Sequence, residues 1–110
     1  DVYICRLGGK KTNKVVERYR VGAGALTIGR RDSQIISDIM FEGDVEMSRR
    51  SVEIMVIPTM EGTVIKLKVL KATNPIVVGY RSLVQGEVVA IHFGEIITLG
   101  RTAITITNTL

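Results

Sequence analysis

The sequence predicts an all-β fold, organised as a sandwich or barrel of short strands. Strand-length runs rich in Val, Ile and Thr recur along the chain, glycine-containing turns separate them, and no segment keeps a helical period. Aromatic residues make up only 5% of the chain and Trp is absent, so branched aliphatic side chains, which favour pleated sheets, must build the core. The predicted strands are Val2 to Leu7, Val15 to Val21, Ala25 to Ile28, Val52 to Ile57, Thr63 to Leu70, Pro75 to Gly79, Glu87 to Phe93, Ile96 to Leu99 and Thr102 to Thr107.

Two of these predicted strands alternate regularly between two sets of side chains. An antiparallel strand with one buried face and one solvated face has this pattern. We therefore expect each of the two strands to bury one set and to expose the other. The sets are Val64, Lys66 and Lys68 against Ile65, Leu67 and Val69, and Thr102, Ile104 and Ile106 against Ala103, Thr105 and Thr107.

Segment 31–50 interrupts the rhythm of strands and turns. It is charged and polar around a short apolar island, Ile35-Ile36 and Ile39-Met40-Phe41. We expect a loop, a short strand and a second loop. Long irregular segments in compact domains tend to carry function, so this is where we place a binding site.

The length of 110 residues suits one domain, which we expect to cover residues 1–110 and to have been cut from a longer protein. A formal net charge of +4 favours anionic partners, whether nucleic acid, phospholipid or phosphopeptide. No apolar run approaches the roughly 20 residues that span a bilayer, and no signal peptide is visible. The single cysteine, Cys5, excludes an internal disulfide, and we therefore expect a reducing, cytoplasmic location.

Three segments in a fixed order carry a resemblance to a known family. They are Leu26-Thr27-Ile28-Gly29-Arg30, Ser48-Arg49-Arg50-Ser51-Val52-Glu53-Ile54, and Ala72-Thr73-Asn74 with the strand that follows. The segment from Phe93 to Gly100 adds a closing pattern of glycine turn, apolar strand and Leu-Gly. Over nearly the whole chain, this order resembles the forkhead-associated (FHA) domain. The resemblance implies a β-sandwich of two antiparallel sheets, like that of FHA and SMAD domains, with a phosphothreonine-peptide site in the loops at one end and an adaptor role in signalling.

The residue types in these segments suit phosphate chemistry. A phosphothreonine presents nearly two negative charges and three strong acceptor oxygens, so its site needs fixed donors and positive charge. Arginine supplies a planar fork of donors, and hydroxyls and amides supply the rest. The resemblance implies that Arg30 and Ser48 contact the phosphate, that Arg49 and Thr73 assist, and that Asn74 binds the peptide backbone.

Three positions depart from the family pattern. Ser51 stands where the family usually has a histidine that braces the loops, and Pro75 stands where a glycine usually follows Asn74. Proline removes an amide donor and pushes the preceding residue towards extended geometry. Val78-Gly79 replaces a second Asn-Gly, which would remove the residue best suited to a tight turn. The alternative to a phosphopeptide reader is therefore a degenerate FHA scaffold that binds a protein without phosphate.

Several of these residues also have ordinary structural interpretations. Arg30 and Arg49 can be solvated loop charges, and Ser48 and Asn74 can be turn residues. The sequence alone leaves these alternatives open.

Other polar residues carry no recognisable chemistry. The acidic residues Glu42, Asp44 and Glu46 lack the spacing of an EF-hand loop, so we expect a solvated loop and no metal site. His92, the only histidine, is expected to be a partly buried strand residue, and Cys5 a small core residue.

No recognisable catalytic pattern joins a nucleophile with a base, so we expect no enzyme and no cofactor. The few aromatic residues do not interleave into a stacking platform, so we expect no nucleic-acid partner. Because no apolar run is long enough to span a bilayer, we expect no membrane partner either. A third possibility is an interaction module that uses the surface of the sandwich in place of its loops.

Overall fold

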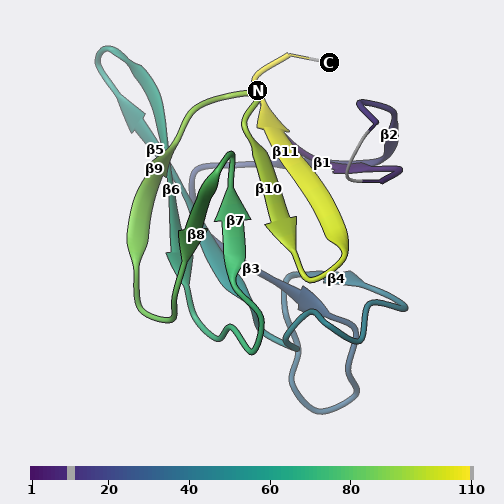
Figure 1. Ribbon diagram of the computed structural model, residues 1–110. Coiled ribbons are helices and arrows are strands. Elements are labelled where there is room, and N and C mark those ends of the chain that lie inside the picture. The colour runs from purple at the N-terminus through teal and green to yellow at the C-terminus, as the bar shows by residue number, and fades with distance from the viewer. Residues whose placement is uncertain (10–11, 110) are drawn as a thin grey trace.

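The computed structural model describes residues 1–9 and 12–109, which form a two-layered β-sandwich (Figure 1). Six strands form one sheet in the order β2-β1-β11-β10-β7-β8, and five form the other in the order β4-β3-β5-β6-β9. Within these described residues, no helix is long and apolar enough to cross a membrane. The strands are β1 (Val2–Leu7), β2 (Val15–Val21), β3 (Gly24–Arg30), β4 (Ile39–Phe41), β5 (Val52–Thr59), β6 (Gly62–Val69), β7 (Ile76–Val78), β8 (Arg81–Leu83), β9 (Val88–Ile91), β10 (Ile96–Leu99) and β11 (Thr102–Thr107).

Almost all of the strand pairs are antiparallel, as expected. The exception is β4, which lies parallel to β3 with Ile28 opposite Ile39 and Arg30 opposite Phe41. Loop 31–38 makes this possible because it carries the chain back along the sheet edge before β4 begins. Both β4 and the returning loop therefore lie beside the end of β3.

The core lies between the two sheets and is built from their facing aliphatic side chains. Ile4 and Ile106 from one sheet and Ile54 and Leu67 from the other have no exposed surface. Each such burial contributes about 1.5–3 kcal/mol to folding. The predicted alternation of residues 64–70 is confirmed, since Ile65, Leu67 and Val69 are buried while Val64, Lys66 and Lys68 are exposed.

The prediction of one solvated face on β11 is wrong. Ala103 and Thr105 are 1% and 8% exposed, although they lie on the face opposite Ile104 and Ile106. The strand is inside its sheet, between β1 and β10, so its small side chains are flanked on both sides by the side chains of neighbouring strands. Thr105 satisfies its hydroxyl by donating to the carbonyl oxygen of Glu95 at 2.9 Å.

Two further expectations are corrected near the chain's C-terminal half. His92 is exposed and follows the end of β9, so it is not a partly buried strand residue. The turn at Val78-Gly79 does not lack a suitable residue, because Gly79 has a φ of 60° and joins β7 to the unpredicted strand β8. A glycine at the first central position suits a two-residue hairpin turn.

Candidate functional site

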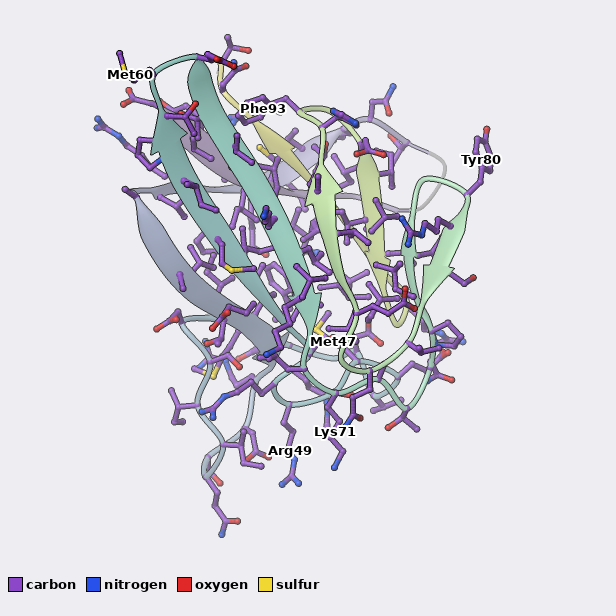
Figure 2. All side chains as sticks on the ribbon, turned by 90° about the vertical axis from the view of Figure 1, so that its left-hand side faces the viewer. Met47, Arg49, Met60, Lys71, Tyr80 and Phe93 are labelled. Atoms are coloured by element: carbon purple, nitrogen blue, oxygen red, sulfur yellow. The ribbon has the colours of Figure 1, made fainter. Side chains whose placement is uncertain are left out.

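The candidate site lies where three loops meet at one end of the sandwich, the lower end in Figure 1. Loop 31–38 precedes β4, loop 42–51 joins β4 to β5, and loop 70–75 joins β6 to β7. Figure 2 shows Arg49 and Lys71 projecting from this end, while Met60 and Tyr80 project from the other. A cleft of about 610 Å³ opens between the loops, a volume in the range of ligand sites. Its lining is Arg30, Gln34, Ile35, Val45, Glu46, Met47, Ser48, Arg49, Arg50, Leu70, Lys71, Thr73 and Asn74.

All five residues that the sequence singled out line this one cleft. Arg30 comes from the end of β3, Ser48 and Arg49 from loop 42–51, and Thr73 and Asn74 from loop 70–75. The structure thus brings together residues that are up to 44 positions apart in the sequence, from Arg30 to Asn74.

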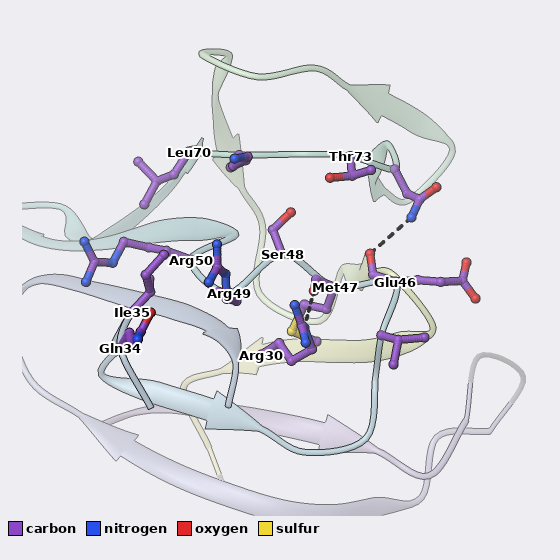
Figure 3. Close-up of a pocket in the computed structure, with 13 residues that line it drawn as sticks. Arg30, Gln34, Ile35, Glu46, Met47, Ser48, Arg49, Arg50, Leu70 and Thr73 are labelled. Atoms are coloured by element: carbon purple, nitrogen blue, oxygen red, sulfur yellow. Dashed lines mark hydrogen bonds between the residues drawn. The ribbon is translucent and has the colours of Figure 1, made fainter. Parts of the chain in front are cut away.

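Arg30 is held in place while most of its guanidinium stays free. Its backbone amide donates to the carbonyl oxygen of Ser48 at 3.0 Å, and its Nε donates to the carbonyl oxygen of Met47 at 3.1 Å (Figure 3). In the described part of the chain, it forms no ion pair with any carboxylate. The two terminal nitrogens of a pre-oriented fork are therefore left for an anion.

The neighbouring Arg31 does not line the cleft. It pairs with Glu42 at 2.9 Å and lines a second depression of about 280 Å³, near the edge strands β2 and β4. There Glu17 pairs with Arg6 and accepts a hydrogen bond from the hydroxyl of Tyr19, and that bond helps to hold the pKa of Glu17 below its ordinary value. Each arginine here has a carboxylate partner, so this depression offers no free positive charge.

Loop 42–51 is fixed by a buried carboxylate. Asp44 is only 5% exposed and accepts three hydrogen bonds: from the amide of Arg101 at 2.8 Å, the hydroxyl of Thr102 at 2.6 Å and the amide of Glu46 at 3.1 Å. The expectation of a solvated acidic loop is therefore wrong for Asp44, although it holds for the exposed Glu42 and Glu46. Asp44 ties the loop that carries Ser48 and Arg49 to the β10–β11 turn.

The backbone at Arg49 is packed directly against β3. Its carbonyl oxygen accepts a hydrogen bond from the hydroxyl of Ser37 at 2.9 Å. A Cβ atom added to Gly29 would lie 1.9 Å from that oxygen, which no side chain could tolerate. Both residues of the Gly-Arg pair at the end of β3 are therefore needed. Gly29 leaves room for the backbone of loop 42–51 to pack against β3, and Arg30 lines the cleft beside it.

The guanidinium of Arg49 is partly neutralised. Its Nη1 lies 3.9 Å from Oδ1 of Asp32. The other oxygen of Asp32 accepts hydrogen bonds from the amides of Gln34 and Ile35, at 2.9 Å each. These backbone bonds, that of Ile35 first, hold the pKa of Asp32 below its ordinary value. Asp32 therefore stays charged, shapes loop 31–38 and leaves Arg49 a weaker anion ligand than Arg30.

Ser51, in loop 42–51, is bonded through its backbone to strand β3 and to loop 70–75. Its amide donates to the carbonyl oxygen of Ile28 at 2.9 Å, and its own carbonyl oxygen accepts from the amides of Leu70 and Lys71 at 2.9 and 3.2 Å. Ser51 is 1% exposed, and among the described residues its hydroxyl oxygen has no hydrogen-bond partner. The bracing at this departure from the family pattern is thus done by main-chain bonds.

Loop 70–75 is more exposed than loop 42–51. Thr73, Asn74 and Pro75 are all exposed, and the side-chain Nδ2 of Asn74 donates to the carbonyl oxygen of Glu46 at 3.2 Å (Figure 3). Asn74 therefore joins the two loops across the cleft.

The cleft as a whole is electropositive. Four cations line it, and its one lining carboxylate, Glu46, is already paired with Arg101 at 2.6 Å. Within the described residues, no cluster of side chains has the composition of a metal site. Fixed positive charge beside hydroxyl and amide donors can hold a phosphate or a carboxylate. The four cations are Arg30, Arg49, Arg50 and Lys71.

Sequence reasoning missed part of this lining. Lys71, Ile35, Gln34 and Leu70 were not singled out for the site. Lys71 lies two positions before Thr73, and a charged residue beside a recognised motif residue was the one available signal.

Comparison with known proteins identifies the fold. No protein-family model matches the sequence, and a comparison with curated proteins finds no match. Solved structures do match, 61 chains in all.

The yeast Pml1 splicing factor matches with a TM-score of 0.82 and 13% identity, over 98% of this chain and 79% of that one. The FHA domain of the CT664 protein from Chlamydia trachomatis gives 0.77 and 17%, over 99% and 98%. The MEK1 FHA domain, in complex with a phosphothreonine peptide of HOP1, gives 0.72 and 9%, over 98% and 97%. The chain therefore has the forkhead-associated fold, and the fold class predicted from the sequence is confirmed.

Proposed function

We propose that this domain is a phosphothreonine-peptide reader, acting as an adaptor module and not as a catalyst. The observation that carries the proposal is the state of Arg30. Its Nε is fixed on the loop backbone, its other nitrogens are free, and it lines one cleft with the Ser48 hydroxyl. The MEK1 FHA domain has the same fold and was solved with a phosphothreonine peptide, which supports this choice of ligand.

The electrostatics of the cleft support the same ligand. A phosphate brings nearly two negative charges to a place that holds four cations and one carboxylate that is already paired. Charge-assisted hydrogen bonds contribute about 1.5–3 kcal/mol each, so Arg30 alone can account for roughly 10- to 150-fold selectivity for a phosphorylated peptide.

The experiment is a binding titration with a degenerate phosphothreonine peptide library and its unphosphorylated and phosphoserine counterparts. We expect binding that depends on phosphothreonine and that falls about 10-fold or more in Arg30→Ala and in Ser48→Ala. Arg31→Ala is the matched control, because it removes the adjacent arginine, which is paired outside the cleft. Its affinity should change less than about 2-fold, since an exposed ion pair contributes little.

Equal binding of phosphorylated and unphosphorylated peptides would contradict the proposal. It would favour the degenerate scaffold that recognises a protein without phosphate. A thermal melt of each variant distinguishes loss of binding from loss of folding.

A further inference from the structure

One edge strand of the sandwich is long and open on its outer side. The two sheets end in four edge strands, and β2 has seven residues where β4, β8 and β9 have three or four. In the described part of the chain, β2 pairs with β1 on one side and with no strand on the other (Figure 1). It contains no proline, so its outer backbone groups are available to another extended chain.

The face of β2 that turns away from the other sheet carries positive charge. Arg18 and Arg20 are exposed and alternate with half-buried residues. They lie opposite Cys5 and Tyr3 of β1, so neither has a carboxylate beside it in the sheet. Arg20 forms one exposed ion pair, with Asp1 at 3.1 Å, and Arg18 forms none among the described residues. A strand added to this edge would place its own side chains directly opposite the two arginines.

The other face of β2 borders the second depression. Glu17 and Tyr19 line this depression of about 280 Å³, and the ring of Tyr19 lies 6.1 Å from the ring of Phe41. Glu17 is bonded to both Arg6 and Tyr19, so its charge is compensated and does not repel an acidic chain. An added strand would direct every second side chain towards this side of the sheet. An apolar or aromatic side chain fits there, beside the two rings.

The two arginines decide which chain can occupy the edge. If two copies paired antiparallel through β2 with Arg18 on the two-fold axis, Arg18 would face itself. With Tyr19 on the axis, each Arg18 would face an Arg20 of the other copy. Like charges directly opposite each other are destabilising, whereas opposite charges stabilise a strand pair. The edge therefore disfavours a second copy and favours an acidic strand.

We propose that the open edge of β2 is a second docking site, which takes an extended segment of a partner protein whose side chains alternate between acidic and apolar. The partner's backbone continues the six-stranded sheet, and its carboxylates pair with Arg18 and Arg20. Its apolar side chains lie towards Tyr19 and the depression. No residue of β2 lines the cleft, so this site needs no phosphate and is independent of the proposed function.

The test is a selection from an unphosphorylated library of random displayed peptides, followed by anisotropy titration of the enriched peptide. We expect enrichment of sequences with Asp or Glu at every second position. Arg18→Ala combined with Arg20→Ala removes two cross-strand ion pairs and should weaken binding about 5- to 30-fold. Lys66→Ala combined with Lys68→Ala is the matched control, because it removes the same charge from an exposed face of the other sheet. It should leave the affinity unchanged.

Two further measurements distinguish strand pairing from general attraction between charges. Methylation of one alternate set of peptide amides should abolish binding, because those amides donate to β2, while methylation of the other set should have little effect. Arg18→Glu combined with Arg20→Glu should redirect the selection towards Lys or Arg at alternate positions, which loss of a structural role cannot do. A thermal melt of each variant checks that the domain is folded.

The outcomes separate this site from the cleft. No enrichment of the alternating acidic pattern, or affinity that survives in Arg18→Ala combined with Arg20→Ala, would overturn the proposal. Binding lost in Arg30→Ala would place the peptide in the cleft and overturn it as well. A dimer of the free domain that the peptide dissociates would show that a second copy occupies the edge. None of these results bears on phosphothreonine binding, which the titration above tests by itself.

Discussion

The two loops that carry most of the candidate site are held in different ways. Loop 42–51 is anchored by the buried Asp44, by the buried side chain of Met47 and by the contact of the Arg49 carbonyl with β3. Among the described residues, loop 70–75 has main-chain bonds only at its start, from Leu70 and Lys71 to Ser51, and beyond them the side chain of Asn74 adds one exposed hydrogen bond.

This difference suits the two loops to two different roles in binding a peptide. A charged ligand group is bound best by donors that need no rearrangement, and the rigid loop presents Ser48 and Arg49 in that way. Peptide flanks vary between partners, and a lightly held loop with Thr73 and Asn74 can adapt to them. We therefore expect loop 42–51 to set affinity for the anion and loop 70–75 to follow the ligand.

The largest effect should come from removing the anchor of the rigid loop. We expect Asp44→Ala to lower the free energy of unfolding by about 3 kcal/mol, because three hydrogen bonds to a buried carboxylate are lost together. Urea denaturation gives the value, and phosphopeptide affinity should fall as well.

The control for this variant is Glu42→Ala, which removes an exposed carboxylate from the same loop and breaks only its ion pair with Arg31. Its cost should be below about 1 kcal/mol. Equal effects of the two substitutions would show that Asp44 is no anchor.

The contrast between these two acids also shows where sequence patterns stop being informative. Short runs rich in Val, Ile and Thr between glycine-containing turns predicted ten of the eleven strands at least in outline, because β-propensity and turn residues are local features of the sequence. β8 was missed since three residues, Arg81 to Leu83, are too few to alternate. Asp44 was misjudged because its partners, Arg101 and Thr102, lie far away in the chain.

The residues of the candidate site likewise fall into those that the sequence predicted and those that it missed. Arg30, Ser48, Arg49, Thr73 and Asn74 were found through a family resemblance, and the structure places all of them in one cleft. Lys71 was not, because a lysine on a loop has no local pattern that distinguishes a ligand-facing charge from a solvated one.

A smaller change in the free energy of unfolding, of opposite sign, is expected at Ser51, whose main-chain bonds join loop 42–51 to loop 70–75. Ser51→Ala should raise the free energy of unfolding by about 1 kcal/mol, because it removes a buried hydroxyl that has no partner in the described part of the chain and keeps every main-chain bond. Ser37→Ala is the matched control: that hydroxyl is equally buried but donates to the Arg49 carbonyl oxygen, so its loss should cost about 1 kcal/mol. If both substitutions destabilise the domain in urea, the Ser51 hydroxyl contributes to holding the loops together.

The smallest effect on stability should come from the lightly held loop. Asn74→Ala removes one exposed hydrogen bond of 3.2 Å, so we expect the free energy of unfolding to change by less than about 0.5 kcal/mol. Hydrogen exchange is the sharper measurement, because it reports local opening. Exchange of the Leu70 and Lys71 amides, which donate to the Ser51 carbonyl oxygen, should accelerate, while the amide of Met47, bonded to the Asp44 carbonyl oxygen within loop 42–51, should stay protected. Acceleration at Met47 would show that the two loops open as one unit, and the division of work between them would then be wrong.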